Sequence, residues 1–430
     1  MNIRLDRSLP PAARPLNKLH LKPYTTYALS NGIPVYLIPH GSVDVVEVQA
    51  IFRAGKGYQD KVGQAQFTVQ NLQEGTERFS SLDLARQLDG LGAWISNDTE
   101  EPFVALHLAT TTDNLSQGLP LLREVMVAPT FPQREFDNMK QRTLQKISVS
   151  EKQTSYLARR HFRHLMFGTA HTYGIHFGSP ELQQIERQDL LDYHAQYLQP
   201  GNFSLSVVGK FDVQAVLDEL EKTFGQLATQ APNVAVSAAA LTPPPPATGR
   251  HHFEHDGMQA TVRLGHRAFA RSHPDFYGMS MVNTILGGYF GSRLMKNIRE
   301  EKGYTYGIYS SWASFRFDGM FVIQADVGNE YIEPTIREIR SEMHKLMEKG
   351  VTRDELDLVK NYVLGRSISH RETPFQLGDI LRESIANGIS FEEMDREFEI
   401  IQRITPEEVQ ALAQRYFRPD ELLEVVVGKG

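Results

Sequence analysis

The chain has 430 residues, enough for roughly two to four domains that each bury a hydrophobic core. Its 45 Lys and Arg residues against 52 Asp and Glu residues give a formal net charge of -7, which argues against a dedicated surface for nucleic acid or an anionic membrane. Zero Cys residues exclude disulfides, iron–sulfur clusters and thiol catalysis.

The N-terminal segment, residues 1–24, is polar and contains several Pro residues. It has no apolar run of signal-peptide length, so a soluble cytoplasmic protein is the expectation. Its Arg content also suggests a transit peptide, but Pro10, Pro11 and Pro15 would interrupt the amphipathic helix that such a peptide needs. No window of the sequence has the apolar length that spans a bilayer, and no membrane partner is expected.

Strand-like and helix-like segments occur in both halves of the chain. The β-rich segments are 33–38, 45–52, 260–264 and 319–327, and the spacing of long amphipathic helices is found in 133–150 and 332–349. The two kinds of segment do not alternate strictly. This order favours an α+β sandwich over a doubly wound parallel sheet.

Residues 63–76 (GQAQFTVQNLQEGT) have the frame of a zinc-binding helix in which the reactive positions are replaced. The intact motif, G-x-A-H-F-x-E-H-x-x-x-x-G-T, places two His residues on one helical face, where they bind Zn²⁺, and a Glu that activates a water molecule. Here these positions are Gln66, Val69 and Gln70. Neutral amides are poor zinc ligands and Val69 cannot accept a proton, so the pattern predicts a zinc site that has been lost.

The frame resembles the inverzincin peptidases of the pitrilysin/insulinase family, and further segments extend the resemblance over most of the chain. These segments are Phe52-Arg53-Ala54-Gly55, Phe167-Gly168, His171-x-Tyr173-Gly174 and Leu286-Gly287-Gly288. The resemblance implies two homologous α/β-sandwich domains, each a sheet with helices packed on one face, that together form half of a clamshell. The chain is most similar to mitochondrial-processing-peptidase-like members built from two different subunits.

In this family the third zinc ligand is a Glu on a later helix. The family spacing leads from Gln70 to Lys146, within the segment 141–147. The nearest downstream carboxylate, Glu151, lies more than one helical turn too late. All three ligand positions and the general base are therefore replaced, and no metal or other cofactor is expected in this chain.

Residues 92–97 resemble the sheet-edge strand of the family. In active members this edge captures the substrate as an added strand, which gives affinity through the backbone with loose sequence demands. Because the zinc helix has lost its reactive residues, we do not expect this strand to hold a substrate that the chain itself cleaves.

Two His-rich patterns suggest metal sites, and each has a structural alternative. His251-His252-Phe253-Glu254-His255 satisfies H-x-x-E-H, but it follows a Pro run and leads into a β-rich segment. In an extended strand Glu254 would face away from His251 and His255, so a polar strand is the better interpretation. The other pattern is formed by His161, His164 and His171, for which a partly exposed helix face is the alternative to a metal cluster.

The glycines Gly287, Gly288 and Gly291 suggest a phosphate-binding loop. They lack the Gly-Lys-Ser/Thr ending and the preceding strand of such a loop. A turn at a helix end is therefore the better interpretation.

The two halves end in similar sequences. Residues 185–210 align without a gap on 404–429, with seven identities that include Pro200/Pro419 and Lys210/Lys429. A helix, a Pro and a strand can recur by coincidence, but the constant offset favours a duplication. The segment between the halves, 228–250, contains Pro243 to Pro246 and is predicted to be a linker. The predicted domains are 19–227 and 251–430.

Arg299 and Tyr306 match a pair that reaches from the second half toward the zinc-bound substrate in active members of the family. Peptide hydrolysis builds negative charge on the carbonyl oxygen, and a guanidinium and a phenol are suitable donors for that charge. Without the resemblance, Arg299 would be a surface helix charge and Tyr306 an ordinary strand aromatic.

The leading hypothesis from the sequence is the non-zinc subunit of a heterodimeric zinc metallopeptidase. A homologous partner would supply Zn²⁺ and the Glu base, this chain would supply Arg299 and Tyr306, and the substrate would be a peptide or an unfolded polypeptide. This chain would then be inactive alone. The alternatives are a catalytically silent scaffold of the kind found in respiratory complexes and, ranked last, an independent zinc peptidase that uses His251, Glu254 and His255.

Overall fold

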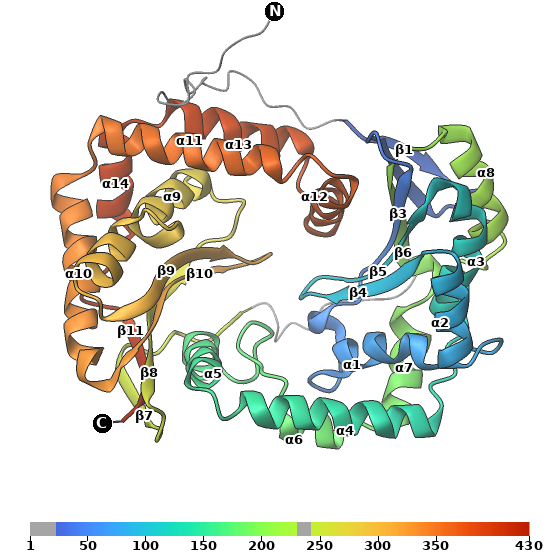
Figure 1. Ribbon diagram of the computed structural model, residues 1–430, viewed down its shortest axis with the longest axis horizontal. Coiled ribbons are helices and arrows are strands. Elements are labelled where there is room, and N and C mark those ends of the chain that lie inside the picture. Colours follow the sequence, from blue (N-terminus) through green and yellow to red (C-terminus); the bar gives the residue numbers. More distant parts are fainter. Residues whose placement is uncertain (1–22, 230–241, 430) are drawn as a thin grey trace, which may run out of the picture.

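A computed structural model of the protein describes residues 23–229 and 242–429. Two mixed sheets lie side by side, each with its own layer of helices (Figure 1). The first sheet has the order β1-β2-β6-β3-β5-β4, and the second has the order β7-β11-β8-β10-β9. The pairs β2–β6 and β7–β11 are parallel and the other pairs are antiparallel. The expected α+β fold with two α/β sandwiches is confirmed.

The strands of the first sheet are β1 (Thr25–Ala28), β2 (Pro34–Pro39), β3 (Val45–Phe52), β4 (Trp94–Thr99), β5 (Val104–Thr111) and β6 (Phe203–Gly209). Those of the second sheet are β7 (Gly249–Glu254), β8 (Gln259–Ala268), β9 (Thr305–Ser314), β10 (Gly319–Gly328) and β11 (Leu423–Gly428). Strands β4 and β9 are edge strands. The prediction of a sheet-edge strand at 92–97 is therefore confirmed.

The helices before the linker segment are α1 (Gln64–Asn71), α2 (Ser81–Gly90), α3 (Leu115–Val127), α4 (Gln133–Ser150), α5 (Thr154–Phe167), α6 (Ser179–Gln184), α7 (Arg187–Tyr197) and α8 (Val213–Phe224). Those after it are α9 (Phe276–Asn283), α10 (Ile332–Lys349), α11 (Arg353–Ser369), α12 (Pro374–Asn387), α13 (Phe391–Arg403) and α14 (Pro406–Tyr416). The predicted helices 133–150 and 332–349 coincide with α4 and α10.

The central strands are buried on both faces. Strand β5 is buried from Val104 to Thr110 without the alternation of a half-exposed strand, and β3 is buried from Val46 to Phe52. One face of the first sheet packs into a core with α1, α3, α7 and α8. Uniform burial requires a second layer on the opposite face as well.

That second layer is exchanged between the halves. Helix α5, from the first half, packs on β8 and β11 of the second sheet, with Phe162 and Met166 against Val425. Helix α12, from the second half, packs on β3 and β6 of the first sheet, with Leu377 and Leu381 against Val208. Figure 1 shows each helix beside the sheet of the other half. Each half therefore has a main hydrophobic core of its own, and the two halves share two smaller clusters formed by the exchanged helices.

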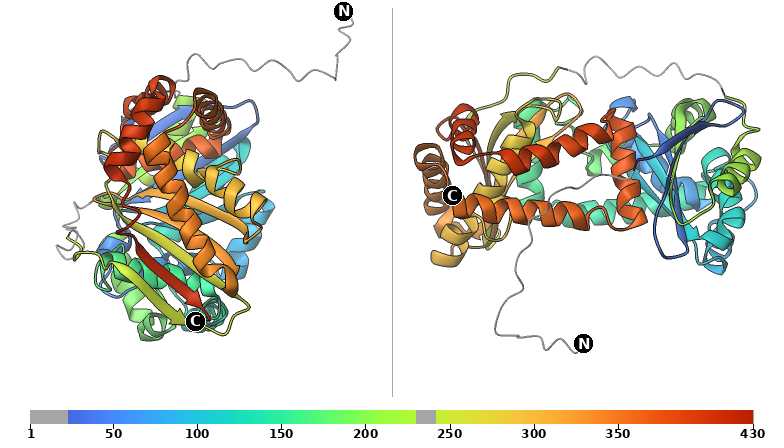
Figure 2. Two further views of the ribbon diagram at one scale, coloured as in Figure 1. Left: turned by 90° about the vertical axis from the view of Figure 1, so that its left-hand side faces the viewer. Right: turned by 90° about the horizontal axis from the view of Figure 1, so that it is seen from above.

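The duplication is visible in the architecture. The aligned segments form α7 with β6 and α14 with β11, and each helix begins at a capping box, with Glu186 and Asp189 in α7 and Thr405 and Glu408 in α14. The exchanged helices α5 and α12 occupy equivalent places in the two repeats. Long helices α11 and α13 contact each other and run between the halves, as the view from above shows (Figure 2).

The predicted domain boundaries, 19–227 and 251–430, stay a prediction. Each sheet is built from strands of one half, but α5 and α12 cross between the halves. The N-terminal segment up to residue 22 and positions 230–241 of the predicted linker lie outside the described residues. Within the described ranges, no helix is both long enough and apolar enough to cross a bilayer.

Candidate functional site: a zinc-helix position without metal ligands

Helix α1 begins at a glycine that the local packing requires. Gly63, at the N-cap, has a φ of 87°, and a Cβ atom there would lie 1.9 Å from the Phe177 ring. Only glycine tolerates both the left-handed backbone and the contact. This turn fixes the start of α1, and therefore the direction in which each α1 side chain points.

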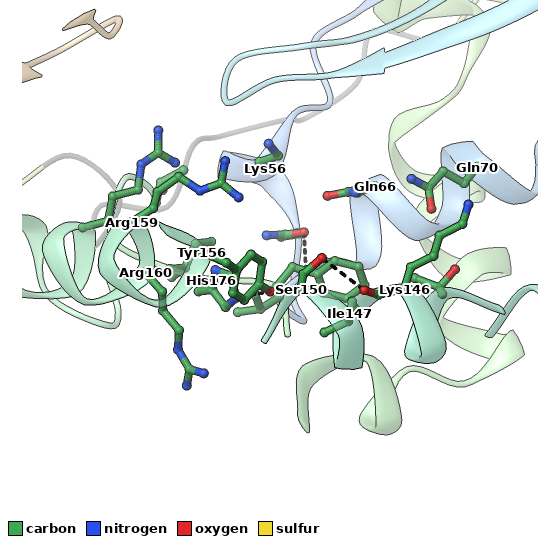
Figure 3. A pocket seen from close by; sticks show the side chains of 18 of the residues that line it. Lys56, Gln66, Gln70, Lys146, Ile147, Ser150, Tyr156, Arg159, Arg160 and His176 are labelled. Carbon is green, nitrogen blue, oxygen red and sulfur yellow. Dashed lines mark hydrogen bonds between the residues drawn. The ribbon is translucent and has the colours of Figure 1, made fainter. Parts of the chain in front are cut away.

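The three reactive positions of α1 face two directions. Gln66 and Gln70 are half-buried and line a cavity of about 730 Å³ (Figure 3). Val69 is fully buried and belongs to the core of the first half. The position of the general base is thus occupied by a packed apolar side chain.

Helix α4 brings Lys146 to the same cavity (Figure 3). This agrees with the placement of the third-ligand position by sequence spacing. Glu151, the nearest downstream carboxylate, instead accepts hydrogen bonds from the Ser179 backbone N–H at 3.3 Å and from its hydroxyl at 3.0 Å. An ammonium group therefore lines the cavity at the position that the family spacing predicts for the third ligand.

These residues do not fit a zinc ion. Two neutral amides and one ammonium group offer neither the imidazole nor the carboxylate donors that zinc requires. In the ranges 23–229 and 242–429 there is no cluster of three or more His, Asp or Glu side chains that could hold a metal. We therefore derive no catalytic step through a metal in this chain.

His176 is the one His that lines the cavity. Its Nε2 atom lies 2.6 Å from the hydroxyl of Tyr156, at hydrogen-bond distance. Burial, reinforced by the nearby charge of Arg160, lowers the pKa of His176 to about 4. The imidazole is therefore neutral at neutral pH, and its contact with Tyr156 joins α5 to the loop after it.

Arg299 and Tyr306 lie side by side in the second half. Arg299 comes from a π-helical turn, η7 (Met295–Glu301), and Tyr306 from edge strand β9. The guanidinium carbon lies 5.4 Å from the centre of the Tyr306 ring and 4.5 Å from that of Phe290, within the range of a cation–π contact. Tyr306 is 90% exposed and Phe290 is 64% exposed. The structure thus brings the two predicted residues together on an exposed surface.

The cation that directly follows this turn, Lys302, has a structural role that Arg299 does not share. Lys302 pairs with Glu338 on α10 at 2.5 Å, and Asn297 donates to Glu338 and Glu342. Arg299 makes no ion pair with any residue of the described ranges. Neither Arg299 nor Tyr306 lines the cavity that contains Gln66, Gln70 and Lys146. The chain therefore presents two separate candidate sites.

The first four residues of the H-x-x-E-H pattern lie in strand β7, as predicted, and His255 directly follows the strand. His251 Nε2 lies 3.3 Å from the Thr248 carbonyl oxygen, and His252 Nε2 lies 3.0 Å from that of Gly428. Alternate residues of a strand face opposite sides, so the geometry of a zinc helix is not formed. These residues therefore do not support an independent zinc peptidase.

The other His group is part of the packing around α5. His161 stacks on Phe253 with ring centres 3.7 Å apart, and buried His171 accepts a hydrogen bond from the Tyr173 backbone N–H. His164 lies against His176, with ring centres 6.3 Å apart. His161 and His164 are partly exposed on α5, as the structural alternative predicted, whereas His171 is buried in the loop after this helix.

The glycine cluster ends a helix rather than forming a phosphate loop. Gly287 and Gly288 lie in a π-helical turn, Thr284–Gly288. A Cβ atom on Gly287 would lie 2.7 Å from the Ser310 hydroxyl of β9. Glycine therefore allows this turn to approach the sheet closely.

The sequence reasoning missed part of the cavity wall. Arg159, Arg160 and Arg163 of α5 line the cavity opposite α1, together with Lys56. Their i, i+1, i+4 spacing places Arg159 and Arg163 on one helical face, and that spacing was a readable signal.

Comparisons with known proteins agree with this picture. Residues 184–363 match the family described as Peptidase M16 inactive domain. The chain is 22% identical over 414 residues to the "Uncharacterized zinc protease YmxG" of Bacillus subtilis, covering 94% of this chain and 98% of that protein. It is 24% identical over 348 residues to the "Non-peptidase homolog YmxG" of Helicobacter pylori, covering 79% and 77%.

A solved structure described as a peptidase M16 inactive domain from Pseudomonas fluorescens superposes with a TM-score of 0.85 at 24% identity, covering 95% of this chain and 98% of that one. This likeness establishes the fold. The family match, the full-length relatives and the replaced ligand positions agree with the resemblance that the motifs indicated. Residues 184–363 therefore match the peptidase M16 inactive-domain family, and the chain as a whole is similar to relatives named as zinc proteases and as a non-peptidase homologue.

Proposed function

We propose that this chain is the non-zinc subunit of a heterodimeric M16 metallopeptidase. A homologous partner would hold Zn²⁺ and the general base, and this chain would complete the peptide-binding chamber. Arg299 and Tyr306 would reach the partner's site and donate hydrogen bonds to the oxyanion that forms during hydrolysis of a peptide or unfolded polypeptide. The partner, the chamber and these two roles all belong to the proposal.

The observation that carries the proposal is the exposed contact between Arg299 and Tyr306. A guanidinium held without a carboxylate partner keeps its N–H donors available, and an exposed phenol keeps its O–H available. Arg293, by contrast, forms a pair of hydrogen bonds with the Glu355 carboxylate.

The test uses the full-length chain with and without a zinc-bearing homologue from the same cell. Purified alone, the chain is expected to contain no stoichiometric zinc by elemental analysis and to cleave no peptide. Native mass spectrometry of a pull-down should recover a heterodimer, and the heterodimer should cleave peptides in a chelator-sensitive manner. One zinc per chain, together with chelator-sensitive hydrolysis by the chain alone, would overturn the proposal.

A scaffold role is the second candidate. It is favoured by the loss of all the zinc-binding positions and by the similarity to a protein named as a non-peptidase homologue. A scaffold predicts a stable assembly in which Arg299 and Tyr306 have no kinetic effect. Recovery of the chain in an assembly without any zinc-bearing homologue would favour the scaffold. For both candidates we propose a cytoplasmic location, which fractionation of the source cell would test.

A further inference from the structure

The cavity beside α1 has walls from several parts of the fold. Gln66 and Gln70 come from α1, Lys146 from α4, Arg159 from α5, Asn97 from edge strand β4 and His176 from the loop after α5. Its volume of about 730 Å³ is in the range of sites that hold an extended ligand rather than a single ion.

The charged side chains that line this cavity are all cationic. They are Lys56, Lys146, Arg159, Arg160 and Arg163, and no Asp or Glu is among the described residues that line it. Figure 3 shows Lys56 and Arg159 on one side of the cavity and Lys146 on the other. Cations on opposing walls create a positive potential that is concentrated inside the cavity.

These cations are not neutralised by ion pairs with other described parts of the chain. None of the five forms an ion pair within the ranges 23–229 and 242–429. The carboxylate of Glu100 acts on Lys56 and Arg163 only at longer range. Two further carboxylates nearby are engaged elsewhere: Glu151 by Ser179, and Glu181 by the Gly178 backbone N–H at 3.0 Å.

Burial makes this arrangement unfavourable without a ligand. Desolvation lowers the pKa of Lys56 and that of Arg163, which means that their charged forms are disfavoured where they stand. The Nε atoms of Arg160 and Arg163 are buried and have no hydrogen-bond acceptor among the described residues. A bound anion would supply both the missing charge and the missing acceptors.

The cavity also offers neutral donors beside a strand edge. The side-chain amides of Gln66, Gln70 and Asn97 make no hydrogen bond to other described residues. Asn97 lies on β4, whose outer edge is not paired with any strand of the described sheet. A polypeptide that pairs with β4 as an added strand would direct every second side chain to one face of the sheet. Those side chains can reach the cavity, because the cavity opens beside β4.

We propose that this cavity binds the carboxylate side chains of an acidic polypeptide segment that lies along β4. The volume and the separation of the cations across opposing walls favour several carboxylates on one chain over a single small anion. This specificity does not depend on the proposed cleavage. It would hold for a scaffold as well as for a peptidase subunit, because it requires neither the partner nor Arg299.

The test measures binding to the full-length chain alone by fluorescence anisotropy. The probes are labelled peptides of one length that carry Glu and Asp, the matched Gln and Asn, or Lys. We expect the acidic peptide to bind more than about tenfold more tightly than the amide peptide, a difference of about 1.4 kcal/mol, and to weaken as salt is added. Equal affinities for the acidic and amide peptides would overturn the proposal.

Two charge reversals and a matched control locate the site. Lys146→Glu and Arg159→Glu change exposed residues, so folding should be preserved, which thermal unfolding will verify. Each should weaken binding of the acidic peptide by more than about tenfold. Arg134→Glu alters an exposed cation on the same helix as Lys146, about 18 Å away along α4, and should leave binding unchanged. Equal effects of the three variants would assign the binding to net charge and overturn the assigned site.

Competition with inorganic phosphate distinguishes the source of the anion. At matched ionic strength, phosphate should displace the acidic peptide no better than chloride does. Displacement at phosphate concentrations close to those of the peptide would identify a small-anion site and overturn the assignment to a polypeptide.

Discussion

The guanidinium carbon of Arg299 lies 5.4 Å from the centre of the Tyr306 ring, although the two residues come from a π-helical turn and an edge strand. Phe290 lies on the guanidinium as well, at 4.5 Å. The two aromatic rings hold this half-buried cation, and no described carboxylate forms an ion pair with it. The pair is therefore oriented by apolar contacts rather than by a carboxylate that would compete for its donors.

In the reconstituted heterodimer, Arg299→Ala or Tyr306→Phe is expected to lower kcat much more than it raises KM. Removing one donor to an oxyanion typically costs about 3 kcal/mol, or roughly a hundredfold in rate. The double variant should cost less than the sum of the single effects, because both groups serve one charge. Steady-state kinetics on zinc-loaded heterodimer provide the measurement.

The matched control for this pair is Lys296→Ala, which removes an exposed cation from the same π-helical turn. Its kcat should equal that of the wild type. If Arg299→Ala and Tyr306→Phe form intact heterodimers with unaltered kcat, the two residues have no catalytic role and the scaffold function is favoured.

Restoring the zinc motif is expected to fail. The triple variant Gln66→His, Val69→Glu, Gln70→His still faces Lys146, which repels Zn²⁺ and leaves two protein ligands where a catalytic site needs three. Elemental analysis should find no stoichiometric zinc, and peptide hydrolysis should be absent. Robust proteolysis by this variant would show that Lys146 does not occupy the third-ligand position.

The same variant should also be less stable than its parent. Val69 is fully buried, so a carboxylate there must be protonated or lose hydration, at a cost of several kcal/mol. The double variant Gln66→His, Gln70→His changes only cavity-lining residues and should unfold close to the wild type. Urea denaturation of the three proteins compares their free energies of unfolding.

Because α5 packs on the sheet of the other half, we expect truncation of one of its buried side chains to lower the free energy of unfolding strongly. Phe162 is fully buried between α5 and the second sheet, and Phe162→Ala should lower the free energy of unfolding by about 3–5 kcal/mol. Leu358→Ala, at a 56% exposed position on α11, should cost far less. A single cooperative unfolding transition is expected for both variants, because the clusters around α5 and α12 couple the two halves. Two separate transitions in the wild type would contradict this.

His176 predicts a pH-dependent contribution to stability. Its folded pKa of about 4 is below the unfolded value of about 6.5, so the unfolded state binds more protons between these limits. The contribution of neutral His176 is therefore complete above about pH 6.5 and declines as the pH falls toward 4. The stability difference between the wild type and His176→Gln should shrink over this interval. A difference that grows on acidification would contradict the lowered pKa.

Local sequence patterns were sufficient to predict many of the helices and strands of the fold. Helices α4 and α10 have long amphipathic periods, and the strands from Val45 and from Gly319 have apolar runs bounded by turns, so each element could be recognised from its own residues. The repeated helix and strand at the end of each half could also be predicted from the sequence. These features depend on neighbours in the sequence.

The helix exchange could not be predicted in this way. The apolar face of α5, formed by Ala158, Phe162 and Met166, shows that the helix is covered but not which sheet covers it. The same limit applies to the candidate site. Counting along the chain located Lys146, whereas the approach of Arg159 to Gln66 depends on where α5 lies in space.

The reciprocal exchange of α5 and α12 has the geometry of a domain-swapped dimer in which the two protomers are joined into one chain. In a swapped dimer, each copy donates the same element to the other, and here equivalent helices of the two repeats do so. A single repeat made as a separate polypeptide would leave one sheet face and one apolar helix face uncovered. Two such polypeptides would cover each other's exposed faces in an intertwined homodimer.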